Sequence, residues 1–186
     1  MKIVPTRLAD VKLIVPTSHA DERGFFAETY NRRAFARAGI DFDFVQDNQS
    51  LSTRAGTVRG LHFQTPPHAI AKLVRVGRGA VFDVALDLRR GSPSYGRHVT
   101  VTLSAANGSQ LLIPVGFAHG FCTLEPDTEV IYKVTGYYSP GHDAGIAWSD
   151  PALGIAWPVA PASAVLSERD RGLPLLADIP DYFIYP

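Results

Sequence analysis

The sequence is poor in cysteine, in uncompensated charge and in long apolar runs, and each shortage excludes a class of protein. Its only cysteine, Cys122, cannot form a disulfide within the chain, so we expect a reduced, cytoplasmic protein in which this thiol is a small buried group. Basic and acidic side chains balance at 18 each, which predicts no attraction to nucleic acid through net charge. Without an apolar run near the roughly 20 residues that cross a bilayer, and with an N-terminus interrupted early, we expect neither a membrane partner nor a signal peptide.

Residues that interrupt regular structure are abundant, with 16 glycines and 14 prolines spread along the chain. Between them, short segments alternate apolar and polar side chains, as half-buried strands do. In the clearest segment, residues 81–88, one face carries Phe82, Val84, Leu86 and Leu88, and the other carries Asp83 and Asp87. Strands this close together leave no room for the helices of a parallel sheet, so the pattern predicts an antiparallel sandwich or barrel. Without repeats or linkers, we expect one domain over residues 1–186.

Other segments give local expectations. Asn31 is placed to cap a short helix that Gly39 ends. Residues 42–45 are expected to form a strand, and the polar run Q-D-N-Q-S at 46–50 that follows is typical of a solvated loop. From Pro140 onward the pattern weakens, and we expect loops and short turns that pack over the barrel or against a partner chain.

The most unusual stretch, residues 59–72, reads R-G-L-H-F-Q-T-P-P-H-A-I-A-K. Cations at both ends and two histidines between them suit a site that lines a barrel, although a plain strand with incidental histidines also fits. Lys72 opens an apolar strand, where an inward ammonium would need an anion. Tyr132 faces inward by alternation, so its hydroxyl needs a partner. Asp170, in a charge-rich segment, would by itself suggest solvated surface.

Six motifs taken in order indicate a relationship: D-E-R-G-F-F-A-E-T-Y, F-V-Q-D-N-Q-S, V-R-G-L-H-F-Q, A-K-L-V-R-V, P-V-G-F-A-H-G-F and L-S-E-R-D-R-G-L-P. Between about Pro16 and Pro174 the chain resembles the dTDP-4-dehydrorhamnose 3,5-epimerase family. The resemblance implies an all-β fold, a cupin-type antiparallel jelly-roll barrel with a few short helices. It also implies a homodimer, no metal, no cofactor, and epimerisation of a dTDP-linked 4-keto-6-deoxyhexose.

The resemblance also assigns roles to residues. His62 would be the base, Asp170 its orienting carboxylate, Lys72 the cation at the developing oxyanion, and Tyr132 the donor of the returning proton. The substrate-binding positions would be Arg23, Phe26, Glu28, Gln46, Asn48, Arg59, His119, Tyr138, Asp143 and Arg169. Among them, Arg23 and Glu28 would reach the site of the neighbouring subunit, and Arg59 would clamp the diphosphate. Asp143 and Arg169 depart from the glutamate and lysine of relatives but keep the charge.

One geometrical difficulty and several alternatives stay open. Strict alternation puts Arg59 and His62 on opposite faces of one strand, so we predict a bulge or twist near Gly60 that lets both meet one ligand. A mono-epimerase acting at C3 or C5 alone would use the same base and acid. A metal-dependent cupin oxygenase is disfavoured because the central strand carries H-F-Q and no H-x-H. A non-catalytic sugar-nucleotide binder would bind the ligand without exchanging its protons.

Overall fold

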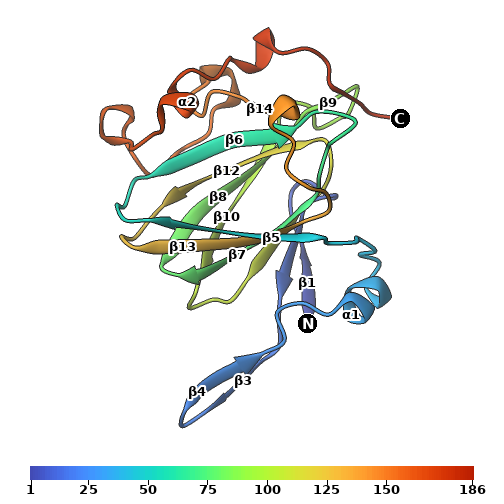
Figure 1. The fold of residues 1–186 in the computed structure, drawn as a ribbon, viewed down its shortest axis with the longest axis vertical. Coiled ribbons are helices and arrows are strands. Elements are labelled where there is room, and N and C mark those ends of the chain that lie inside the picture. Colours follow the sequence, from blue (N-terminus) through green and yellow to red (C-terminus); the bar gives the residue numbers. More distant parts are fainter.

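The computed structural model describes residues 1–186 and consists mainly of two facing antiparallel sheets (Figure 1). The six-stranded sheet contains, in spatial order, β1 (Lys2–Pro5), β2 (Lys12–Val15), β11 (Gln110–Ile113), β7 (Lys72–Arg78), β13 (Thr128–Val134) and β5 (Gln46–Ser52). The five-stranded sheet contains β10 (His98–Ser104), β8 (Ala80–Asp87), β12 (Phe117–Thr123), β6 (Val58–Gln64) and β14 (Asp143–Gly145). Most neighbouring strands are distant in sequence, as in a jelly roll, and the predicted all-β antiparallel fold of the cupin type is confirmed.

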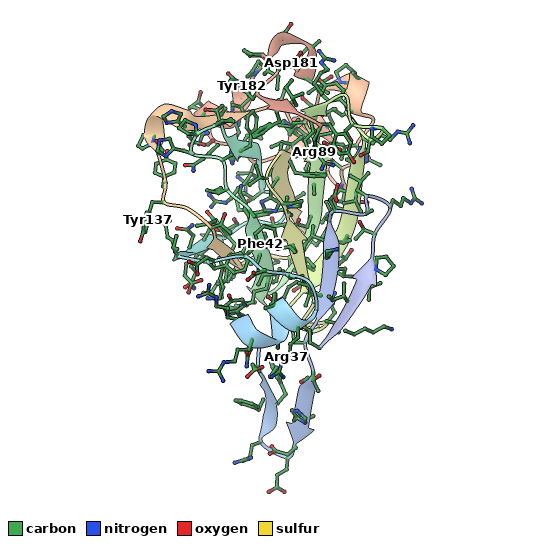
Figure 2. The ribbon with its side chains drawn as sticks, turned by 90° about the vertical axis from the view of Figure 1, so that its right-hand side faces the viewer. Arg37, Phe42, Arg89, Tyr137, Asp181 and Tyr182 are labelled. Atoms are coloured by element: carbon green, nitrogen blue, oxygen red, sulfur yellow. The ribbon has the colours of Figure 1, made fainter.

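The remaining elements are short. A hairpin of β3 (Ser18–Asp21) and β4 (Gly24–Ala27) projects from one end of the molecule (Figures 1 and 2). The α-helices are α1 (Arg32–Arg37) and α2 (Glu168–Arg171), and β9 (Arg89–Arg90) pairs in parallel with β15 (Phe183–Ile184). Four 3₁₀ turns occupy Pro140–His142, Pro151–Leu153, Pro161–Ser163 and Leu176–Asp178. No helix is long and apolar enough to span a membrane.

Apolar side chains form three main layers around the two sheets. The central layer lies between the sheets and includes Val74, Val81, Ala85, Phe117 and Val130. A second layer joins the outer face of the five-stranded sheet to the C-terminal segment, from which Leu153 and Phe183 are buried. The third packs Phe35 of α1 on the outer face of the six-stranded sheet. The C-terminal segment therefore covers the barrel, as its weak strand pattern predicted.

The alternation of β8 was recognised correctly, but the strand is not half-buried. Both of its faces are buried, and Asp83 and Asp87 are completely inaccessible. Val84 and Leu86 pack outward under the C-terminal segment, while Val81 and Ala85, which share the face of Asp83, point between the sheets. The prediction was wrong because a later part of the chain covers the apolar face, which leaves the carboxylates inside the barrel.

Two further expectations were wrong. Residues 42–45 form no strand, although Phe42 and Phe44 still pack against the third apolar layer. The polar run at 46–50 is not a loop but most of β5, which pairs with β13 along its whole length. Residues 46–50 of β5 alternate between partly buried and exposed positions, but all five are polar. A search for alternating apolar residues therefore does not recognise this strand.

Two local predictions are confirmed. The Asn31 side chain caps α1 by accepting a hydrogen bond from Ala34 N at 3.2 Å. The pairing of β6 with β12 shifts register between His119 and Phe121, opposite Gly60, whose φ is +108°. This irregularity provides the bulge that turns Arg59 and His62 to the same side.

We expect Gly60→Ala to destabilise the protein by roughly 2–4 kcal/mol, measured as the free energy of unfolding in urea. A Cβ at Gly60 would lie 2.6 Å from the His119 carbonyl oxygen and 2.7 Å from Gly120 Cα, in a backbone conformation that only glycine adopts readily. Gly141→Ala is the matched control, because its Cβ would meet nothing within 4 Å. Equal stability of the two variants would contradict the close packing of the bulge.

Candidate active site

A cavity of about 490 Å³ lies between the sheets and is closed on one side by the C-terminal segment. It is lined by Ser50, Thr57, Val58, Arg59, His62, Lys72, His119, Phe121, Tyr132, Val165, Leu166, Ser167, Arg169 and Asp170. An adjoining cavity of about 200 Å³ shares His62, Lys72, Tyr132 and Arg169 and adds Gln46, Asn48, Tyr138 and Asp143. The two cavities therefore meet at the four shared side chains, and most sequence-predicted site residues border one or both.

His62 is held by a carboxylate from outside the barrel. Its Nε2 lies 2.6 Å from Asp170 Oδ1. Ser167 caps α2 by accepting from Asp170 N at 3.1 Å, and Asp170, buried to 4 % exposure, also accepts a long hydrogen bond from Gly60 N at 3.4 Å. Burial raises the pKa of the Asp170 carboxyl, but hydrogen bonds and charge from His62 outweigh it, so this pKa stays below its ordinary value. The ionised carboxylate therefore accepts from Nε2–H, and the other ring nitrogen of His62 is left as a base.

Lys72 and Tyr132 face His62 from the six-stranded sheet. The Lys72 ammonium donates to the His62 carbonyl oxygen at 3.3 Å. Desolvation lowers the pKa of Lys72 to about 8, although the charges of Asp143 and Asp83 act in the opposite direction. Burial raises the pKa of the Tyr132 phenol. At neutral pH the site therefore contains the Lys72 ammonium and a protonated Tyr132 phenol close to the His62 imidazole.

The structure adds Asp83, which the sequence did not point to as a site residue, as the partner of His119. His119 Nε2 lies 3.0 Å and 3.1 Å from the two carboxylate oxygens of Asp83, deep between the sheets. Burial lowers the pKa of His119, while Asp83 acts to raise it. The signal was present in the sequence, since Asp83 alternates with apolar residues on a strand, but a half-buried strand would expose the face that carries the carboxylate.

Residues expected to contact the ligand lie around the mouth of the cavities. Arg59 donates to Ser52 Oγ at 3.1 Å and to the Leu51 carbonyl oxygen at 3.2 Å, and its guanidinium still borders the larger cavity. Gln46 Nε2 donates to Asn48 Oδ1 at 2.8 Å on the inner face of β5. The strand that was mistaken for a loop thus brings both amides to the smaller cavity.

Asp143 links two other predicted ligand contacts. Its carboxylate accepts from the Tyr138 hydroxyl at 2.9 Å and pairs with the Arg169 guanidinium at 2.8 Å. The shorter side chain at 143 therefore still reaches the cation at 169. Tyr138 is exposed, and its neighbour Tyr137 extends away from the barrel (Figure 2).

Three predicted positions lie far from both cavities of their own chain. Arg23 pairs with Asp21 in the projecting hairpin, and Glu28 accepts from Asn31 Nδ2 at 3.0 Å. Phe26 is 72 % exposed on β4. The structure does not bring Arg23, Phe26 and Glu28 to the site of the chain that carries them.

In chemical terms, the cavities hold a base with its carboxylate, a phenol that can donate a proton, and an ammonium between them. Such a set can remove a proton from one carbon, stabilise the resulting oxyanion and return a proton. His, Cys, Asp and Glu side chains form no group of three or more placed to hold a metal ion.

The chain resembles known proteins over nearly its whole length. Residues 5–178 match the family model described as dTDP-4-dehydrorhamnose 3,5-epimerase. The chain belongs to this family. It is 53 % identical, over 96 % of its length and 91 % of the relative, to the dTDP-4-dehydrorhamnose 3,5-epimerase of Sinorhizobium fredii.

Solved structures of the 3,5-epimerase family have the same fold. The chain is similar to the dTDP-4-dehydrorhamnose 3,5-epimerase of Bacillus anthracis, crystallised with TDP and pyrophosphate, with 51 % identity and a TM-score of 0.91 over 94 % of this chain and 98 % of that one. It is also similar to the dTDP-6-deoxy-D-glucose-3,5-epimerase of Legionella pneumophila in complex with dTDP-4-keto-L-rhamnose, with 41 % identity and a TM-score of 0.95 over 100 % and 98 % of the chains.

The low pKa of Lys72 can be measured directly, because the chain has only four lysines: Lys2, Lys12, Lys72 and Lys133. In protein labelled with ¹³C at lysine Cε, we expect one NMR resonance to titrate with a midpoint of about 8, because burial disfavours the ammonium. Lys72→Arg should remove this resonance alone and so assign it. A Lys72 midpoint at the ordinary lysine value of about 10.4 would contradict its desolvation within the barrel.

Proposed function

We propose that the protein is a dTDP-4-dehydrorhamnose 3,5-epimerase, which converts dTDP-4-keto-6-deoxy-D-glucose into dTDP-4-keto-L-rhamnose on the route to dTDP-L-rhamnose. The observation that carries the proposal is that His62 and Tyr132 line the same cavity, with the Lys72 ammonium beside them. Family membership supports the substrate class, and the identity of 53 % to a 3,5-epimerase favours double epimerisation over action at one carbon.

The reaction follows from the acidity of the carbons that flank a ketone. C3 and C5 both adjoin the C4 carbonyl, so loss of either proton leaves an electron pair that delocalises onto O4 as an enolate. His62 takes the proton, and Asp170 stabilises the imidazolium that forms. The Lys72 ammonium stabilises the negative O4. Tyr132 then donates a proton to the same carbon from the opposite side, and both groups exchange protons with water before the next carbon reacts.

The other predicted contacts would hold the nucleotide. The Arg59 guanidinium at the cavity mouth suits a diphosphate, because its planar fork can bond two phosphate oxygens at once. Gln46, Asn48 and His119 offer hydrogen bonds along the cavity wall. The exposed ring of Tyr138, tethered to Asp143, suits stacking against the sugar or base.

The projecting hairpin supports a homodimer. Arg23, Phe26 and Glu28 have no ligand site within reach in their own chain, and Phe25 and Phe26 expose 71 % and 72 % of their surface. Exposed aromatic side chains on a projecting hairpin suit burial against a partner. We therefore propose that the protein is a homodimer in which each hairpin enters the site of the other subunit. Each chain of this dimer would form a single domain.

Solvent exchange tests the proposed reaction. With dTDP-4-keto-6-deoxyglucose in deuterium oxide, the wild-type protein should incorporate deuterium at both C3 and C5, read separately by NMR. His62→Ala should lose roughly 10²–10⁴-fold of this exchange, because it removes the base. Tyr132→Phe should reduce inversion more than proton abstraction, because only the returning proton is lost.

Each alternative outcome has a distinct meaning. Deuterium at a single carbon would identify a mono-epimerase, and bound ligand without any exchange would identify a non-catalytic binder. Undiminished exchange in His62→Ala would remove His62 from its proposed role. Equal losses of exchange and inversion in Tyr132→Phe would contradict the assignment of the two faces.

Mixing of two inactive variants tests the proposed dimer. His62→Ala lacks the base, and Arg23→Ala lacks the hairpin cation, but a mixed dimer would combine an intact barrel with an intact hairpin in one of its two sites. With random exchange of subunits, an equimolar mixture should therefore recover roughly a quarter of wild-type activity. A mixture of either variant with itself is the control, and absence of recovery after verified subunit exchange would place Arg23 in its own chain's site or outside any site.

A further inference from the structure

Asp83 occupies a position that stability alone does not explain. It is completely buried on the inner face of β8, among the apolar side chains of the central layer. The only hydrogen-bond partner of its carboxylate is His119. Removing a carboxylate and an imidazole from water costs free energy that a pair of apolar side chains of similar size would not cost. A buried pair of this kind beside a reactive cavity therefore points to a role in the site.

The order of the strands places the pair beside the proposed base. β8, β12 and β6 are neighbours, Asp83 lies opposite Phe121, and His119 lies directly opposite His62. The side chains thus follow one another as carboxylate, imidazole, imidazole and carboxylate, from Asp83 of β8 through His119 of β12 and His62 of β6 to Asp170 of α2. Each carboxylate bonds Nε2 of the nearer ring, which leaves the second nitrogen of each ring unpaired.

Lys72 faces this row from the opposite sheet, and several charges act on it. Asp143 of β14 and Asp83 of β8 favour its charged form, while Arg169 of α2 and desolvation oppose it. Burial lowers the pKa of His119 and the Lys72 ammonium lowers it further, while Asp83 acts to raise it. Asp143 is already paired with Arg169 at 2.8 Å, so its negative charge is partly neutralised. Asp83 has no cationic partner of its own, because burial keeps His119 neutral.

We propose that Asp83 is a positioning residue of the site, which fixes the tautomer and orientation of His119 and helps to keep Lys72 protonated. The inference rests on the proposed function of Lys72 at O4. An ionised Asp83 accepts from Nε2–H of His119, so the other nitrogen is an acceptor for a sugar hydroxyl. Its negative charge also lowers the cost of holding an ammonium in the barrel before the enolate forms.

Asp83→Asn separates the charge from the hydrogen bond, because the amide oxygen can still accept from His119 while the negative charge is lost. We expect the NMR titration midpoint of Lys72 to fall by about 0.5–1 pH unit. The decline of kcat/KM at high pH, which reports the free enzyme, should move down by the same amount. Asp83→Ala should in addition lower kcat roughly 10-fold or more, because His119 is no longer held in place.

Asp87→Asn is the matched control. Asp87 lies on the same face of β8 and is equally buried, but it is bound by Arg89, Ser92 and Ser94 away from the cavities. This variant should lower the melting temperature and leave both the Lys72 midpoint and the pH profile unchanged. If Asp83→Asn does not fold, Asp83→Ser serves for the same titration.

The outcomes separate this inference from the proposed reaction. A lower melting temperature with an unmoved Lys72 midpoint in folded Asp83 variants would make Asp83 purely structural and overturn the inference. A shifted midpoint in a protein whose wild type shows no solvent exchange would support the inference and refute the epimerase reaction. If the Lys72 midpoint and the high-pH decline of kcat/KM both shift, the result supports both the inference about Asp83 and the proposed epimerase reaction.

Discussion

The contact on which the rest of the site depends is the one between Asp170 and His62. A single carboxylate, 4 % exposed, lies 2.6 Å from the imidazole and also accepts from the backbone of the bulge at Gly60. It therefore joins three separate parts of the chain: a short capped helix, a barrel strand and the irregularity that turns Arg59 and His62 to one side. An ion buried in this way is tolerated because each oxygen has a donor. The same donors keep the carboxylate ionised, which prepares the ring as a base.

Much of the fold and the central part of the site could be predicted from the sequence, for physical reasons that differ by residue. The alternation around Tyr132 correctly predicted that its side chain points inward. Strict alternation put Arg59 and His62 on opposite faces of one strand, which was enough to predict a bulge at the one glycine between them. β5 was not predicted, because the residues that alternate between partly buried and exposed positions in residues 46–50 are all polar. Their burial depends on a cavity that only the folded barrel creates. The inward face of Asp83 was missed because a segment some 70 or more residues later covers the other face of its strand.

The two His–carboxylate pairs lie beside the apolar central layer of the barrel. Apolar packing of the central layer holds the sheets at a fixed separation, so Lys72 and Tyr132 on one sheet face His62 and His119 on the other. Preorganised groups of this kind need little rearrangement when charge develops during a reaction. The nucleotide contacts proposed for the loops and the hairpin can vary more freely, because these segments lie outside this packed framework.

The position of α2 has a consequence for synthesis of the chain. Every strand of the two large sheets is complete by Gly145, whereas the helix that carries Asp170 comes later. A barrel emerging from the ribosome would already contain its imidazole and its ammonium but would lack the carboxylate that makes the imidazole reactive. The proposed proton transfer would thus begin only when the C-terminal segment has packed on the outer face of the five-stranded sheet, so the same step that buries this apolar face also completes the site.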